Sequence, residues 1–261
     1  MDKIEIFQVD AFTDKLFYGN PAAVCLLDCW LNDELMQAIA VENNLSETAF
    51  IIKEDEHFAI RWFTPNGEIK LCGHATLAAG FVLFECAGYK GHTVKFSSLS
   101  GPLYVYYHDQ ILTLDLPRLN FAPINASKAF IDLVDKPFDA IYESEFDYIM
   151  LFDHQLTAEK VIVNLPMLAS LAKRGLIITA KGIQTDYYAR CFYPKHNISE
   201  DPVTGSAHGV LVPFWTEKLG KSSLYALQGS KRQGTLIGEV IDNRVRMSGH
   251  CKLYSCGYLV I

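Results

Sequence analysis

The sequence lacks several patterns that identify common kinds of binding site. Its 30 Asp and Glu residues outnumber 23 Lys and Arg, and no basic cluster could displace counterions from a nucleic acid. The seven cysteines show no paired CxxC spacing and the histidines no HxxxH spacing, so neither predicts a zinc site. We therefore expect free thiols, no metal and no nucleic-acid partner.

Membrane spans and nucleotide motifs are also missing. The longest apolar stretch, residues 75–84, is about half the length needed to cross a bilayer. The first residues, MDKIEIFQVDAF, alternate like a strand and lack the basic start and apolar run of a secretion signal. GxGxxG, GxxxxGK[ST] and GxSxG motifs are absent. We expect a cytoplasmic protein that is neither a membrane protein nor a nucleotide-binding protein.

An internal repeat runs through most of the chain. Four landmarks recur in the same order, which is the pattern left by a duplication. Both copies of the second landmark begin with Gly and reach Glu twelve residues later. The landmarks pair as 61–65 with 190–194, 73–85 with 205–217, 101–103 with 234–236, and 109–110 with 242–243.

Each copy predicts strands, then one apolar helix, then a hairpin. Alternation over 103–114 and 236–247, broken by polar turns, predicts the two hairpins. The Ala- and Leu-rich segment 75–85 predicts a helix that is apolar nearly all round, which needs sheet on every side.

The expected fold class is α+β. We expect two pseudo-symmetric lobes, each a curled, mostly antiparallel, barrel-like sheet wrapped around a central helix. The N-terminal lobe is expected at 1–116, with strand 252–261 returning to it, and the C-terminal lobe at 117–251. Residues 117–147, with Pro123 and Pro137, are expected to be the crossover between lobes.

Two helix N-termini are candidates for binding a substrate carboxylate. Unpaired N–H groups and a partial positive charge at such an end attract anions. Gly73 and Gly205 would let a ligand approach the backbone, and Ser206 adds a hydroxyl donor. A pseudo-twofold would bring both ends to the lobe interface, where small-molecule sites preferentially occur. The alternative is ordinary N-capping.

Three polar residues near these ends are candidates for proton transfer. His74 lies at the first helix end, and Asp201 lies just before the second. Glu47 follows the helix expected over 33–41, among apolar neighbours that disfavour the charged form of a carboxylate. Each also has a structural alternative: a cap for Asp201, a satisfied polar group for His74, and a solvated strand-edge carboxylate for Glu47.

At four places the sequence resembles the PhzF-like family of phenazine biosynthesis. The strings DAFTDKLFYGNPAAV, NNLSETAF, LCGHATLAA and EDPVTGSA occur in that family's order and spacing. The resemblance implies the diaminopimelate epimerase fold, a homodimer, a site between the lobes, and no metal or organic cofactor. It also implies an isomerase that moves a proton between carbons of a small carboxylate-bearing substrate, such as a cyclic or aromatic-like amino acid.

The resemblance implies roles for particular residues. Glu47 is expected to be the proton-transferring base, with His74 and Asp201 completing the catalytic set. A carboxylate held by helix ends would stabilise the charge that builds up during proton abstraction. The expected substrate-binding residues are Gly73, Gly205 and Ser206.

Two alternative functions stay open. Amino-acid epimerases of this fold use one cysteine from each lobe, and Cys72 occupies the first of those positions. The repeat places Thr204, a poor base, at the second, which leaves an epimerase, racemase or Cys72-dependent dehydratase as the weaker enzyme hypothesis. The other alternative is a non-catalytic small-molecule-binding or interaction protein.

Overall fold

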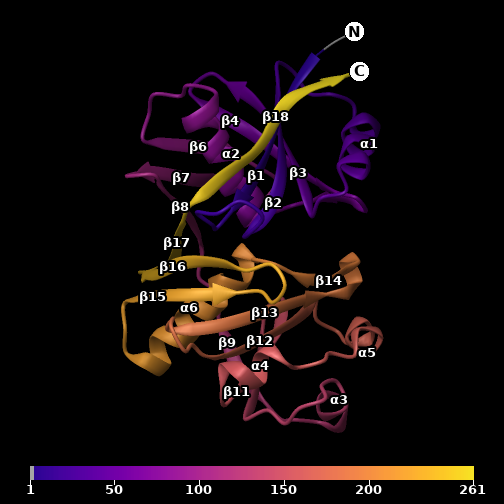
Figure 1. The fold of residues 1–261 in the computed structure, drawn as a ribbon, viewed down its shortest axis with the longest axis vertical. Coiled ribbons are helices and arrows are strands. Elements are labelled where there is room, and N and C mark those ends of the chain that lie inside the picture. Colours follow the sequence, from indigo (N-terminus) through magenta and orange to yellow (C-terminus); the bar gives the residue numbers. More distant parts are fainter. Residues whose placement is uncertain (1–2) are drawn as a thin grey trace. The chain divides into compact units, whose positions relative to one another are not determined.

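The computed structural model describes residues 3–261 as two compact units (Figure 1). Unit 1 comprises the described residues up to Asp115 together with Ser248–Ile261, and unit 2 is Leu116–Met247. Residues 248–251, which the sequence analysis assigned to the C-terminal lobe, therefore belong to unit 1. The strand expected at the start of the chain is β1, and positions 1 and 2 of that prediction lie outside the described residues.

Unit 1 is a curled sheet around one helix. Strands pair in the order β18-β1-β2-β3-β4-β6-β7-β8, with β2–β3 and β4–β6 parallel, the other pairs antiparallel, and β5 added to β4. In Figure 1 the yellow β18 lies along the indigo β1, as this pairing requires. The elements are β1 (Lys3–Ala11), β2 (Asn20–Leu27), α1 (Asp33–Asn43), β3 (Glu47–Glu54), β4 (His57–Thr64), β5 (Gly67–Ile69), α2 (Gly73–Phe81), β6 (Thr93–Ser97), β7 (Leu103–His108), β8 (Ile111–Pro117) and β18 (Cys251–Val260).

The apolar helix α2 is buried by sheet, as the sequence predicts. Every residue from Gly73 to Gly80 is buried, and the helix contacts β1, β2, β3, β7 and β18. It continues as a π-helical turn, Val82–Cys86. Small residues permit the close packing: a Cβ on Gly80 would lie 2.7 Å from a methyl group of Val105.

Unit 2 repeats the strand pairing of unit 1. The pairs β10–β11, β11–β12, β12–β13, β13–β14, β13–β15 and β15–β16 have the same directions as β1–β2, β2–β3, β3–β4, β4–β5, β4–β6 and β6–β7. The elements are β9 (Phe121–Ile124), α3 (Lys128–Ile131), β10 (Ala140–Ser144), β11 (Asp147–Phe152), α4 (Gln155–Glu159), α5 (Leu165–Ser170), β12 (Gly175–Lys181), β13 (Tyr187–Tyr193), a 3₁₀ turn (Pro194–His196), β14 (Ile198–Asp201), α6 (Gly205–Leu219), β15 (Ser223–Gln228), β16 (Gly234–Ile241) and β17 (Arg244–Gly249). The two sequence copies therefore have the same topology, and the α+β prediction is confirmed.

The repeated arginines make the same contacts in each unit. Arg61 binds Glu68 of β5 through Nε and Nη2, and Arg190 binds Glu200 of β14 in the same two-point manner. Both guanidinium groups also lie over the phenylalanine two positions later in the chain, at 5.1 and 4.9 Å from the ring centroid. A shared structural contact thus explains the first landmark of the repeat.

The prediction that residues 117–147 form a crossover between the lobes is wrong. It contains β9 and β10, which pair antiparallel as the first strands of unit 2. Pro123 made β9 hard to predict, because a proline is rare within a strand and is tolerated only where its missing N–H is not needed. The helix expected at 33–41 is α1, and the expected hairpins are β7–β8 and β16–β17, with positive φ at Asp109 and Asp242.

The core of unit 2 contains a buried histidine whose proton position can be assigned. Oε1 of Gln228 accepts from the backbone N–H of Thr204, so the contact of 2.8 Å from His208 Nε2 to that oxygen needs a proton on Nε2. Nδ1 then accepts from the Tyr187 hydroxyl at 2.7 Å. Burial lowers the pKa of His208 to about 4, so the ring is neutral over the physiological range.

We predict that His208 makes unit 2 acid-sensitive. The unfolded chain binds a proton to this imidazole below about pH 6.5, whereas the folded chain does so only below about pH 4. The free energy of unfolding therefore decreases as the pH is lowered from about 6.5 to about 4. The pKa shift lowers the free energy of unfolding by about 3 kcal/mol at pH 4. Urea unfolding across this range should show a flatter pH slope for His208→Asn than for wild type. The same change at exposed His108 should leave the slope unaltered.

Candidate functional site

The pairing of β2 with β3 places two polar side chains beside the start of α2. These strands are parallel, with Ala22 opposite Glu47, so Asn20 and Glu47 lie at the same end of the sheet. Glu47 is the first residue of β3, and His74 is the second residue of α2. Because the sheet wraps the helix, the helix end and these strand ends meet.

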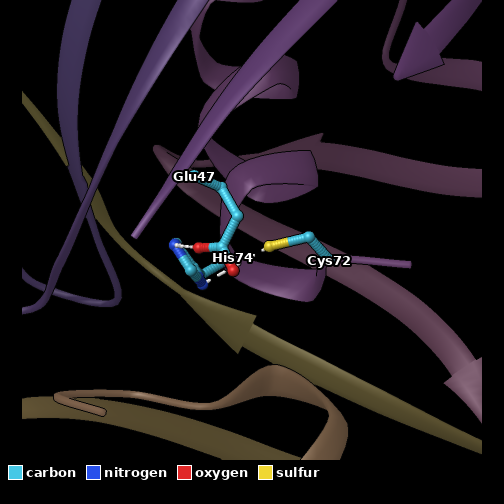
Figure 2. Close-up of side chains that lie close together, drawn as sticks. All are labelled: Glu47, Cys72 and His74. Carbon is cyan, nitrogen blue, oxygen red and sulfur yellow. Dashed lines mark hydrogen bonds and ion pairs between the residues drawn. The ribbon is translucent and has the colours of Figure 1, made fainter. Parts of the chain in front are cut away.

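Glu47 and His74 form a buried ion pair in unit 1. His74 Nε2 lies 3.0 Å from Glu47 Oε2, and the two residues are 3% and 7% exposed (Figure 2). Neither atom has a hydrogen-bond partner among the described residues, so the contact is one of charge rather than a directed hydrogen bond. This burial rules out the solvated strand-edge alternative for Glu47.

The other ring nitrogen contacts Asn20 and Cys72. The Asn20 amide Nδ2 lies 3.2 Å from His74 Nδ1, and Cys72 Sγ lies 3.6 Å from it. With a neutral ring Asn20 donates to Nδ1, and with a protonated ring a turned amide would accept instead. Asn20 was not predicted as a site residue although it lies in the string DAFTDKLFYGNPAAV, because no spacing rule links it to His74.

Opposing effects set the charge of this cluster. Burial alone would lower the pKa of His74, but contact with Cys72 and with Glu47 outweighs it, and the pKa is raised well above its usual 6.5. Burial raises the pKa of Cys72, and the Glu47 charge raises it further, so the thiol stays protonated. These directions favour a protonated His74 ring beside the Glu47 carboxylate and a neutral Cys72 thiol near Nδ1.

Unit 2 holds the second group of expected site residues. Asp201 ends β14 and is buried, and its Oδ2 accepts from the Thr204 hydroxyl at 2.5 Å. Gly205 and Ser206 begin α6, directly after Thr204. Thr204 and Cys72 occupy the same place in their units, each being the N-cap residue of the central helix.

Ser206 has a charged neighbour that the sequence analysis did not identify. Arg174 Nη2 donates to Ser206 Oγ at 3.1 Å and, with Nε, binds the buried Asp147 carboxylate. Arg174 precedes β12, so strand pairing rather than any local motif brings it to α6.

Both central helices start without a side-chain cap. Neither Cys72 nor Thr204 makes a side-chain capping hydrogen bond, and neither helix has an acidic residue in its first turn. The alternative of ordinary side-chain N-capping therefore does not hold at these two ends. Their N–H groups and partial positive charges are suited to an anion.

The structure thus brings Glu47 and His74 together, at the helix end that Gly73 begins. Asp201, Gly205 and Ser206 lie together in unit 2, and their convergence with the first group stays a prediction. All seven cysteines are free thiols, as expected. Over residues 3–261 no helix is both long and apolar enough to span a membrane.

Comparisons with known proteins agree with the resemblance. The model of the PhzC-PhzF family, phenazine biosynthesis-like protein, matches residues 9–257. The chain belongs to this family. A protein of Pseudomonas aeruginosa named as an uncharacterized isomerase is 43% identical over 255 residues, which cover 98% of each chain.

Solved structures extend the likeness to the fold. The crystal structure of a PhzF-family protein from Enterococcus faecalis matches with a TM-score of 0.97 and 41% identity, covering all of both chains. A hydroxyproline epimerase from Agrobacterium vitis matches with a TM-score of 0.66 at 10% identity, over 98% of this chain and 92% of that one. The second match shows that PhzF-family chains and an amino-acid epimerase share this fold.

We predict that Glu47 holds the proton on His74. NMR measurement of histidine nitrogen shifts against pH should show that wild-type His74 stays protonated well above pH 6.5. In Glu47→Gln, which lacks the negative charge, the His74 pKa should be lower. The raised pKa also predicts a stabilisation that is full below about pH 6.5 and lost as pH rises through the folded-state value. Asp109→Asn, beside exposed His108, is the control; a His74 midpoint unchanged by Glu47→Gln would refute the coupling.

Proposed function

We propose that this chain, an isomerase of the phenazine biosynthesis-like family, moves a proton between carbons of a small carboxylate-bearing substrate. Glu47 is the base that removes the proton and the acid that returns it. The observation that carries the proposal is the buried Glu47–His74 pair at the uncapped start of α2.

Burial makes Glu47 suitable for proton transfer from carbon. Its Oε2 has no hydrogen-bond partner among the described residues, so a lone pair is available to a substrate proton. His74 provides the positive charge that pairs with this carboxylate. Proton return to a neighbouring carbon would restore the same ion pair, so the reaction could proceed without a net change in the site.

Helix ends are proposed to hold the substrate carboxylate. Gly73 begins α2 and Gly205 begins α6, and both ends lack capping side chains and first-turn acids. Ser206 would add a hydroxyl donor, and the family resemblance assigns Asp201 to the catalytic set. These assignments from unit 2, like the expected homodimer, are supported by family membership.

The alternative base, Cys72, is less suited to the task. Burial and the Glu47 charge raise the pKa of its thiol, and a protonated thiol cannot accept a proton. In unit 2 the matching position is Thr204, whose hydroxyl already donates to Asp201. A two-base epimerisation would therefore lack a base in both places.

Glu47→Gln is predicted to abolish carbon–proton exchange and to spare binding. The amide keeps the shape but cannot accept a proton, so the loss should reach roughly 10² to 10⁴-fold. Deuterium uptake into cyclic and aromatic-like amino acids in deuterated water, read by mass spectrometry, measures exchange, and thermal shift measures binding.

Matched cysteine variants separate the two possible bases. Cys72→Ser should exchange almost as fast as wild type, and so should Cys256→Ser at an exposed position. Full exchange by Glu47→Gln together with loss in Cys72→Ser would make the thiol the base. Binding without exchange in the wild type, over the whole substrate panel, would favour the non-catalytic alternative.

Ser206→Ala is predicted to weaken substrate binding rather than chemistry. Loss of one hydrogen bond to a charged carboxylate should raise KM roughly 10- to 100-fold at nearly constant kcat. Steady-state kinetics on a substrate found in the exchange assay provide the test. Ser170→Ala, at an exposed position of α5, should change neither constant. An equal fall in kcat and kcat/KM would contradict a role in ground-state binding.

A further inference from the structure

Cys72 is a buried thiol that the proposed proton transfer does not use. Its Sγ lies 3.6 Å from His74 Nδ1, whereas the Glu47 carboxylate contacts Nε2 of the same ring. One donor atom each from Glu47, Cys72 and His74 lie within 4.8 Å of one another, and all three residues are buried. Figure 2 shows the three side chains converging from the start of β3 and from the residues that begin α2.

We propose that Glu47, Cys72 and His74 form a binding site for one thiophilic divalent cation of the Zn²⁺ class, and that the bound cation inhibits proton transfer. Binding itself needs only these three side chains. The inhibition rests on the proposed function, since it assumes that Glu47 is the base.

The spacing of the donors is close to what one such cation needs. Zinc binds sulfur at about 2.3 Å and nitrogen or oxygen at about 2.0–2.2 Å, so tetrahedral donors lie roughly 3.3–3.8 Å apart. The Cys72–His74 contact of 3.6 Å already has this length. The widest separation in the cluster, 4.8 Å, requires a side-chain rotation that moves one donor by about 1 Å.

Charge and donor type select the class of cation. A thiolate and a carboxylate together neutralise a divalent cation, and a neutral imidazole completes three ligands without leaving an unpaired buried charge. Thiolate and imidazole favour zinc-like ions over Mg²⁺ or Ca²⁺, which prefer oxygen ligands. Three protein ligands leave a fourth position for water, as in open zinc sites.

The Glu47 carboxylate supports the same conclusion. Glu47 Oε2 is buried, lies 3.0 Å from His74 Nε2, and makes no directed hydrogen bond to any residue the structure describes. Buried polar atoms nearly always make hydrogen bonds, so a carboxylate oxygen held only by an ion pair is suited to an additional ligand. A coordinated cation would bind the Glu47 carboxylate, the Cys72 thiolate and one nitrogen of the neutral His74 ring, and would release one proton from Cys72 and one from His74 to solvent.

Occupancy by a cation excludes the proposed proton transfer. A carboxylate that donates its lone pair to zinc no longer accepts a substrate proton at that oxygen. Cys72 then has a separate role: it strengthens cation binding without being required as a base.

Cobalt spectroscopy on the full chain provides the test. Titration of the metal-free protein with CoCl₂ should give one equivalent bound, with a thiolate-to-cobalt charge-transfer band, and ZnCl₂ should displace it. Cys72→Ser should lose the band and weaken Zn²⁺ affinity by more than the ~10- to 100-fold cost of losing an outer-shell partner. MgCl₂ should not compete.

Control variants address the exposed thiols and the fold. Cys29→Ser and Cys256→Ser remove exposed cysteines and should keep the band. Cys72 makes no side-chain capping bond, so Cys72→Ser should fold, and urea unfolding checks this. His74→Gln provides a second ligand variant and should also weaken Zn²⁺ binding. No cobalt binding by wild type, or a band that survives in Cys72→Ser, would overturn the proposal.

The two proposals can fail separately. Cobalt binding that depends on Cys72, together with full proton exchange by Glu47→Gln, would leave the cation site standing and refute Glu47 as the base. Exchange that depends on Glu47 but persists undiminished with saturating ZnCl₂ would refute the inhibitory site alone.

Discussion

Burial of α2 on all sides is the constraint on which unit 1 depends. A helix enclosed by sheet can carry polar side chains only where a neighbour satisfies them, and in α2 they are confined to the first turn. Thr76 returns its hydroxyl to the carbonyl of Cys72, and His74 contacts Asn20 and Glu47. The same enclosure that makes the helix apolar therefore concentrates the polar chemistry of unit 1 at one helix end.

The buried ion pair at this end is better explained by chemistry than by stability. Taking two charges out of water costs several kcal/mol per ion, and an apolar pair of similar volume is often as stable. Glu47 and His74 recover little of that cost through hydrogen bonds, since Oε2 and Nε2 lack partners in the described chain. A buried ion pair that gains little stability from hydrogen bonds is typical of functional sites.

The repeat, the enclosed helices and the hairpins could be predicted from the sequence, because local pattern determines them. The Gly-to-Glu apolar segments and the polar turns are short-range signals, and the structure confirms the elements they predict. The first strands of unit 2 were missed because Pro123 obscures β9. Asn20 and Arg174 were missed for a different reason: their contacts with His74 and Ser206 come from strand pairing and leave no spacing in the sequence. The same limit applies to the cluster of Glu47, Cys72 and His74, which matches no metal-binding motif.

Comparison of the two helix ends shows how one fold supports two different chemical environments. In each unit, the start of one strand lies beside the second residue of the central helix. The strand is β3 in unit 1 and β12 in unit 2. In unit 1 this places a carboxylate against an imidazole, and in unit 2 it places the Arg174 guanidinium against the Ser206 hydroxyl. Asp147 neutralises Arg174 and holds it in place, and the Asp201, Thr204 and Gln228 side chains are tied together by hydrogen bonds. The end of unit 2 is thus fixed by a satisfied network, which suits it to orienting a ligand. The end of unit 1 instead holds a buried carboxylate and imidazole joined by an ion pair, which suits it to exchanging a proton.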